Sequence, residues 1–309
     1  ALHAVGSQDH SRSHFEAMSA MERGLADSTS GPSSGWVARH LLATETPGDS
    51  PLRAVAFSSI MPDSLRGATH ATVLNSLSEY KLDLADSGRG PAAKSLARLY
   101  NVGTDEISVA GRSTLATLET LSKLNPEEYK PSNGAVYPES PLSHGFRQTA
   151  CLIRAKVGME VACLEGGGWD THVAQGTNVP QGQNVGIIGN LIMDLGNCMA
   201  AFNQDMGSEM KKVTVVVMTE FGRRLNENNG IGTDHGRGGA MFVMGGGVRG
   251  GRVMGKWPGL EPDKLDEVGD LKVTTDYRNV IAEILEKLAG GKDLEKVFAG
   301  HQPEFLGVM

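Results

Sequence analysis

The chain has no long apolar runs. Its longest, such as residues 213–218, fall far below the roughly 20 residues that a helix needs to cross a bilayer, so the sequence predicts no membrane span. A block of basic residues is also missing, because 29 Lys and Arg are interspersed with 36 Asp and Glu for a net charge of −7. This charge pattern does not favour a nucleic-acid partner or a membrane-binding face.

Cysteines are few, and they are not arranged as a disulfide framework. Cys151, Cys163 and Cys198 are odd in number, widely spaced and set in apolar patterns. This favours buried free thiols over a disulfide or a thiolate metal site. No charged-then-apolar export segment opens the chain, which starts at Ala1 inside an expected strand. We therefore expect an N-terminal portion to precede Ala1 and any export signal to lie there.

Apolar strand patterns that alternate with helical patterns determine the expected fold. Strands are expected at 2–5, 52–58, 160–164, 213–219 and 240–244. Helices are expected at 14–23, 36–42, 91–101, 104–124, 141–157, 183–209 and 275–288, the last capped by Thr274 or Thr275. Continuous apolar strands predict an α/β three-layer sandwich with a mainly parallel sheet covered by helices on both faces. The chain of 309 residues is long enough for one domain, 1–309, with 91–140 as a candidate helical insertion.

The first candidate site segment is GGGWDTH, which follows the strand at 160–164. Asp170 and His172 are two residues apart, a spacing that places both side chains on one side of an extended chain. Both could then bind one cation, and the glycines allow a close backbone approach. The alternative is a surface loop in which Asp170 caps a turn.

Glu220 and Arg223 form the second segment. Glu220 ends the strand at 213–219, and ligands of parallel α/β sheets bind just beyond such strand ends. Arg223 could clamp an oxyanion with two hydrogen bonds. The alternative is a solvated Glu–Arg pair.

The third segment holds Asp234 and His235, which are adjacent and flanked by Gly232 and Gly236. Adjacent ligands in a glycine-flanked loop can face different metals. The three segments together predict a metal centre at the strand ends with five ligands: Asp170, His172, Glu220, Asp234 and His235. These ligand types suit Zn²⁺, Mn²⁺ or Ca²⁺ and include no thiolate. Five ligands exceed the three of an open zinc site, which favours two metals.

Arg12 and His14 follow the first expected strand and precede a helix. This position again favours a site at a strand end, where both side chains could contact an anionic substrate. The alternative is a helix start in which Ser13 caps and Glu16 completes a capping box.

Several segments, in this order, resemble an uncharacterised bacterial family that is often exported by the twin-arginine route. The segments are SRSHFEAMSAMERG, SGWVARHLL, GGGWDTH, VVVMTEFGRR, GTDHGRGGAMFVMGGG and VTTDYRNVIAEIL. The resemblance covers essentially the whole chain, and it places the chain in the alkaline phosphatase and sulfatase superfamily.

That resemblance implies an alkaline-phosphatase-like α/β sandwich with one or two divalent metals at the strand ends. Asp170 and His172 would form one half of the site, and Asp234 and His235 would supply the later histidine-type ligand. Glu220 stands where the superfamily usually has an Asp-His pair, and Phe221 departs from that pair. The superfamily nucleophile, a Ser, Thr or modified Cys, has no match here, and we expect it upstream of Ala1.

The function expected from these observations is metal-dependent hydrolysis of a small anionic phosphate or sulfate ester. Arg223, Arg12 and His14 would hold the anion. The alternative is a non-catalytic cell-envelope binding or accessory protein that retains the fold. A third option keeps the metals for another hydrolysis, such as that of a peptide or lactone. The resemblance implies a periplasmic or exported protein.

Overall fold

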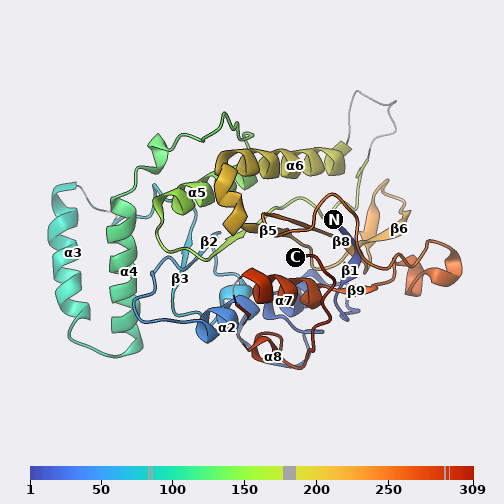
Figure 1. The fold of residues 1–309 in the computed structure, drawn as a ribbon, viewed down its shortest axis with the longest axis horizontal. Coiled ribbons are helices and arrows are strands. Elements are labelled where there is room, and N and C mark those ends of the chain that lie inside the picture. The colour runs from blue at the N-terminus through green and yellow to red at the C-terminus, as the bar shows by residue number, and fades with distance from the viewer. Residues whose placement is uncertain (83, 85, 177–185, 289, 292) are drawn as a thin grey trace.

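A computed structural model describes residues 1–82, 84, 86–176, 186–288, 290–291 and 293–309. Two β-sheets lie between helices that cover both of their faces (Figure 1). The chain is therefore a mixed α/β protein with a parallel sheet, as the sequence predicts. Among the described residues, no helix combines the length and the apolar character that crossing a membrane requires.

The first sheet has three parallel strands in the order β3–β2–β4. Strand β2 (Ala54–Phe57) is central, between β3 (Ala71–Leu74) and β4 (Val161–Leu164). Ala54 and Val55 have no exposed surface, which is typical of a parallel strand that is covered on both faces.

The second sheet has four strands and is mixed. In order across the sheet they are β5 (Thr214–Val217), β8 (Gly239–Gly245), β1 (Leu2–Gly6) and β9 (Thr275–Asp276). Strand β1 runs parallel to β9, whereas β8 is antiparallel to both β1 and β5. The expected single, mainly parallel sheet is thus realised as one parallel sheet and one mixed sheet.

A hairpin between β5 and β8 explains the antiparallel strand. Its strands β6 (Arg223–Glu227) and β7 (Thr233–His235) pair with each other, so no helix carries the chain back to begin a parallel strand. Because β8 runs against its neighbours, it begins at the edge where β1 and β5 end. Residues that precede β8 therefore meet residues that follow β1 and β5.

Helices cover both faces of the sheets (Figure 1). On one face lie α5 (Pro141–Ala155) and α6 (Gly186–Met206). On the other face lie α1 (His14–Arg23), α2 (Trp36–Ala43) and α7 (Tyr277–Leu288). The described residues also include a short helix α8 (Leu294–Val297) and 3-10 turns at 63–65, 126–128, 207–212, 262–264 and 267–269.

Apolar clusters join each helical layer to the sheets. Phe146 of α5 and Phe202 of α6 pack with Val215 of β5 on one face. Ile281 of α7 packs with Met241 of β8 on the other. Burial of each such side chain contributes roughly 1.5–3 kcal/mol to stability, so these clusters fix the strand ends in place.

Helices α3 (Asp86–Tyr100) and α4 (Glu106–Ser122) form a pair at one end of the molecule (Figure 1). Helix α4 reaches the core through Leu121 and through Thr117, which is buried beside Thr72. The pair begins a few residues before the predicted insertion at 91–140, and that assignment stays a prediction.

Most expected elements are confirmed to within a few residues, and α1 matches its predicted bounds. Strands β3, β6, β7 and β9 were not predicted. Thr275 lies in β9 instead of capping a helix, and the Asp276 carboxylate accepts the N–H of Arg278 at 2.9 Å. The helix predicted at 183–209 is found from Gly186, and residues 183–185 lie outside the described residues.

The three cysteines are free, as predicted. Cys151 and Cys198 are buried and Cys163 is partly buried. Burial raises the pKa of the Cys163 thiol to about 12, so this thiol stays protonated at neutral pH and is a poor nucleophile and metal ligand.

Asp205 on α6 is a fully buried carboxylate that fastens the connection before α5. It accepts the hydroxyls of Tyr129 and Tyr137 at 2.8 and 2.9 Å and the N–H of Ser132 at 2.7 Å. Burial, together with the bond to Asp205, raises the pKa of both tyrosines. The phenols therefore remain donors.

We expect Asp205→Asn to lower the free energy of unfolding by about 2 kcal/mol, because an amide nitrogen would face donors that need an acceptor. Denaturant titration measures this change. Asn203→Ala, at an exposed position of the same helix, serves as the control and should shift stability by no more than about 0.5 kcal/mol. Equal shifts for the two variants would contradict the role given to Asp205.

Candidate metal centre

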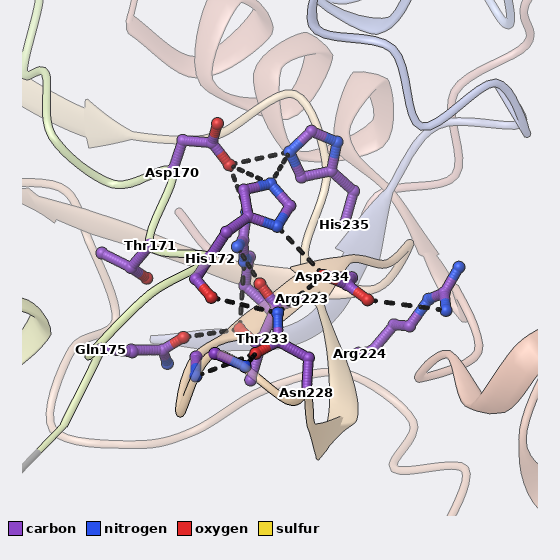
Figure 2. Close-up of polar contacts among 12 residues, drawn as sticks. Asp170, Thr171, His172, Gln175, Arg223, Arg224, Asn228, Thr233, Asp234 and His235 are labelled. Carbon is purple, nitrogen blue, oxygen red and sulfur yellow. Dashed lines mark hydrogen bonds and ion pairs between the residues drawn. The ribbon is translucent and has the colours of Figure 1, made fainter.

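Three histidines and one aspartate meet at the edge where β1 and β5 end and β8 begins. His14 is the first residue of α1, which follows β1. Asp170 and His172 follow β4 through the glycine run, and His235 ends β7, just before β8. Figure 2 shows Asp170, His172 and His235 pointing toward one another.

The polar atoms of these residues are close together. Asp170 Oδ1 lies 2.9 Å from His172 Nε2 and 2.8 Å from His235 Nε2. The two Nε2 atoms are themselves 2.9 Å apart. His14 Nε2 lies 3.2 Å from the other carboxylate oxygen, Asp170 Oδ2.

The outer nitrogen of each imidazole faces an oxygen. His14 Nδ1 lies 2.7 Å from Glu220 Oε1, and His172 Nδ1 lies 3.0 Å from Asp234 Oδ1. His235 Nδ1 lies 2.8 Å from the carbonyl oxygen of Arg12. Carboxylate and carbonyl oxygens only accept, so each Nδ1 carries the hydrogen.

Neutral imidazoles protonated at Nδ1 present a lone pair at Nε2. The lone pairs of His172 and His235 then face each other and the carboxylate of Asp170 with no hydrogen between them. Such an arrangement repels itself unless a cation or additional protons lie between the atoms. Metal-binding histidines have this same pattern, with the outer N–H fixed by a carboxylate or carbonyl.

His14, Asp170 and His235 accordingly form a cluster whose ligand atoms all lie within 4.8 Å of one another, close enough to hold one metal ion. His172 adds a third imidazole nitrogen, and thus a fourth ligand, to this cluster through its contacts with Asp170 and His235. The donor set of three imidazoles and one carboxylate fits a divalent transition metal.

Two predicted ligands lie behind the cluster. Glu220 and Asp234 contact the outer nitrogens of His14 and His172 instead of facing the converging atoms. Asp234 also accepts the amide of Asn228 at 2.8 Å, and this bond, with that of His172, lowers the Asp234 pKa. Both carboxylates therefore orient ligands, in contrast to the direct role that the sequence predicts.

His14 is in the reverse situation, since the sequence predicts an anion contact and the structure places it in the cluster. The bond with Glu220 raises the pKa of His14, against the opposing effect of burial and with further help from Asp170. In the sequence, His14 stands at the start of a helix, and this position is compatible with both an anion contact and a metal ligand. Ser13 does occupy the N-cap position, but its side chain makes no capping hydrogen bond.

Arg223 contacts the cluster directly. Its Nη1 donates to Asp170 Oδ1 at 2.8 Å, its Nε donates to Thr233 Oγ1 at 3.1 Å, and its Nη2 donates to the Thr233 carbonyl (Figure 2). Burial alone would raise the pKa of Asp170, but the hydrogen bond from Arg223, together with those that His235 and His14 donate when their imidazoles are protonated, lowers it well below its usual range. The guanidinium of Arg223 is thus engaged in hydrogen bonds with Asp170 and Thr233.

Arg12 does not point its guanidinium into the cluster. Its Nε donates to the buried carboxylate of Asp270 at 2.7 Å, and only its backbone carbonyl reaches the site, at His235. The predicted anion contact by this side chain is therefore not formed, because the guanidinium is already paired.

Phe221 packs against two of the cluster imidazoles. Its ring centroid lies 5.0 Å from that of His14 and 4.6 Å from that of His235. The ring therefore lies beside both of these imidazoles.

The hairpin approaches the Asp170 loop so closely that glycine is required. A Cβ on Gly232 would lie 2.3 Å from the backbone of His172, and a Cβ on Gly222 would lie 1.9 Å from the carbonyl of Gly238. Both distances are far inside van der Waals contact. These glycines let the backbones that carry the cluster residues touch.

The fold and the cluster define a mixed α/β protein with a candidate metal centre at one edge of its sheets. The chain belongs to the family described as "Protein of unknown function (DUF1501)", whose model matches residues 2–308. No curated protein and no solved structure matches the chain. The family match spans every residue of the cluster.

We expect Gly232→Ala to weaken metal binding by at least tenfold, because the added Cβ pushes the hairpin, and with it His235, away from His172. Isothermal titration with Zn²⁺ measures this loss. The control is Gly167→Ala in the loop that leads to Asp170, where a Cβ would meet nothing within 4 Å. It should bind as the unchanged protein does. Equal affinities for both variants would show that the close approach is not needed.

Proposed function

We propose that this protein is a metal-dependent hydrolase of phosphate or sulfate esters, with its centre formed by His14, Asp170, His172 and His235. The observation that carries this proposal is the convergence of three imidazole Nε2 atoms on one carboxylate, each imidazole fixed from behind by an oxygen. The arrangement consists of four converging side chains and three oxygens behind the imidazoles, and these groups come from four separate segments of the chain.

The residues favour Zn²⁺ or Mn²⁺ over Ca²⁺, because imidazole suits transition metals and Ca²⁺ prefers oxygen ligands. A divalent metal, when bound, supplies Lewis acidity that activates water and offsets the negative charge that develops on an ester during cleavage. Asp170 contributes the anionic ligand, and Arg223 holds that carboxylate in place. Glu220 and Asp234 keep the Nε2 lone pairs of their histidines directed inward.

The centre is accessible to a small substrate. The side chains of His14, Asp170 and His172 are 37%, 46% and 39% exposed, whereas His235 is 19% exposed. Three of the four side chains are therefore accessible to solvent, and His235 is the most buried of them. An open side is what distinguishes a catalytic centre from a closed structural metal site.

Placement at the strand ends supports an alkaline-phosphatase-like relationship as part of this proposal. The cluster lies just beyond β1, β4 and β5, the position at which α/β sheets bind ligands. The sequence resemblance described above is the support for a periplasmic or exported location, and for a small anionic ester as the substrate.

A second candidate is a non-catalytic cell-envelope protein that binds metal without turnover. It is favoured by one observation: the guanidinium of Arg223 is already bonded to Asp170 and Thr233. The side chain predicted to clamp the anion is thus engaged in the resting structure. Turnover measurements separate the two candidates.

Metal binding is the first test. We expect the protein to bind Zn²⁺ or Mn²⁺, and His235→Ala to reduce affinity by more than the roughly 10- to 100-fold loss found for outer-shell partners. Metal analysis after dialysis and titration calorimetry provide the measurement. His144→Ala, an exposed histidine on α5, should change nothing. A protein that binds neither metal, or that binds equally without His235, would refute the centre.

Hydrolysis is the second test. We expect slow turnover of p-nitrophenyl phosphate or sulfate that a chelator abolishes and added Zn²⁺ or Mn²⁺ restores, because the metal supplies the activation. Asp170→Asn should reduce the rate by at least 100-fold, and His144→Ala should leave it unchanged. Firm metal binding with no turnover on either ester would instead support the non-catalytic candidate.

A further inference from the structure

Asp270 is a fully buried carboxylate outside the cluster that nonetheless lies behind two of its ligands. It follows the 3-10 turn Glu267–Gly269 and forms an isolated antiparallel bridge with Arg224 of β6. Next to it, the carbonyl of Leu271 accepts the N–H of Gly238 at 2.9 Å. Backbone pairing therefore fixes Asp270 beside the hairpin that carries Asp234 and His235.

One side of Asp270 reaches His235 through Arg12. Arg12 Nε and Nη2 each lie 2.7 Å from Asp270 Oδ2, and the Arg12 carbonyl accepts from His235 Nδ1 at 2.8 Å. The backbone of Arg12 is left-handed, with φ 54°, a conformation that is strained for a residue other than glycine. The ion pair with Asp270 holds this strained residue, and hence its carbonyl, in place.

The other side of Asp270 reaches His172 through Arg224. Arg224 Nε lies 3.8 Å from Asp270 Oδ1, and Arg224 Nη1 lies 3.9 Å from Asp234 Oδ2. Asp234 Oδ1 in turn contacts His172 Nδ1 at 3.0 Å (Figure 2). Arg224 Nε and Asp270 Oδ1 are buried and lack hydrogen-bond partners among the described residues, so electrostatic attraction alone joins them.

We propose that Asp270 is a positioning residue for the metal centre: a single buried charge that fixes, through two arginines, the groups that orient His235 and His172. This inference rests on the proposed metal centre and adds to it a residue that contacts no ligand. Without the Asp270 charge, the guanidiniums of Arg12 and Arg224 lose their buried counterion. Arg224 would then turn toward Asp234, and the Arg12 carbonyl would no longer be held against His235.

A buried carboxylate can also serve stability alone, and Asp205 provides the matched comparison. Both Asp205 and Asp270 have no exposed surface, and both are tied to segments distant in the chain. Asp205, on α6, accepts from two tyrosines and a backbone amide of the segment before α5, and none of these partners belongs to the cluster. A purely structural role for Asp270 predicts that the two Asp→Asn variants behave alike once folded.

The test uses Co²⁺ as a spectroscopic substitute for the native metal. We expect Asp270→Asn to raise the Kd for Zn²⁺ by about tenfold, the lower end of the loss for outer-shell partners. Its Co²⁺ absorption spectrum should shift from that of the unchanged protein. Asp205→Asn should unfold at lower temperature yet keep the unchanged Kd and spectrum, measured below its unfolding transition.

The outcomes separate this inference from the proposed function. If the unchanged protein binds neither Zn²⁺ nor Co²⁺, the metal centre fails and the inference fails with it. If the unchanged protein binds metal and Asp270→Asn has the same Kd and spectrum, only the positioning role is overturned. Should Asp270→Asn not fold, Arg12→Asn takes its place, because asparagine tolerates the left-handed backbone and removes the ion pair. Unchanged binding by Arg12→Asn would likewise overturn the role.

Discussion

Lone pairs repel one another, and the edge of the sheets brings four sets of them together around Asp170. Two imidazole nitrogens and one carboxylate oxygen lie within 2.9 Å of each other, and the nitrogen of His14 approaches the second oxygen. With the hydrogens on Nδ1, these atoms repel one another unless a cation or a proton lies between them. The outer oxygens of Glu220, Asp234 and Arg12 turn the imidazoles inward, and the glycines of the hairpin allow their backbones to meet.

The direction of one strand makes this convergence geometrically simple. Because β8 is antiparallel to β1 and β5, the residue that precedes it emerges at the edge where its neighbours end. His235 thus joins His14 and Asp170 without a crossover connection. A parallel strand in the same place would have delivered its preceding residue to the opposite edge of the sheet.

Much of this arrangement could be predicted from sequence, but the roles within it could not. Apolar runs predict most strands, and polar residues directly after them locate Asp170, His172 and Glu220. Adjacency does not tell which of Asp234 and His235 faces inward, since that depends on the pairing of a hairpin whose strands have no apolar pattern. Arg12 and Asp270 are 258 residues apart, and nothing local links them. From sequence alone, a charged side chain that forms an ion pair within the fold cannot be distinguished from one that is free to bind a ligand.

The hairpin of β6 and β7 is attached to the protein by a different kind of interaction from the helices and the two sheets. A two-stranded ribbon is marginal by itself, and this one is joined to the Asp170 loop and to Asp270 by backbone and side-chain polar contacts. The helices and the two sheets are held by apolar cores, whereas the hairpin is held by polar and ionic contacts. A cation shared between His235 and the Asp170 loop would therefore add an ionic link between the hairpin and the segment that follows β4. The order of residues 223–235 becomes a readout of whether the centre is filled.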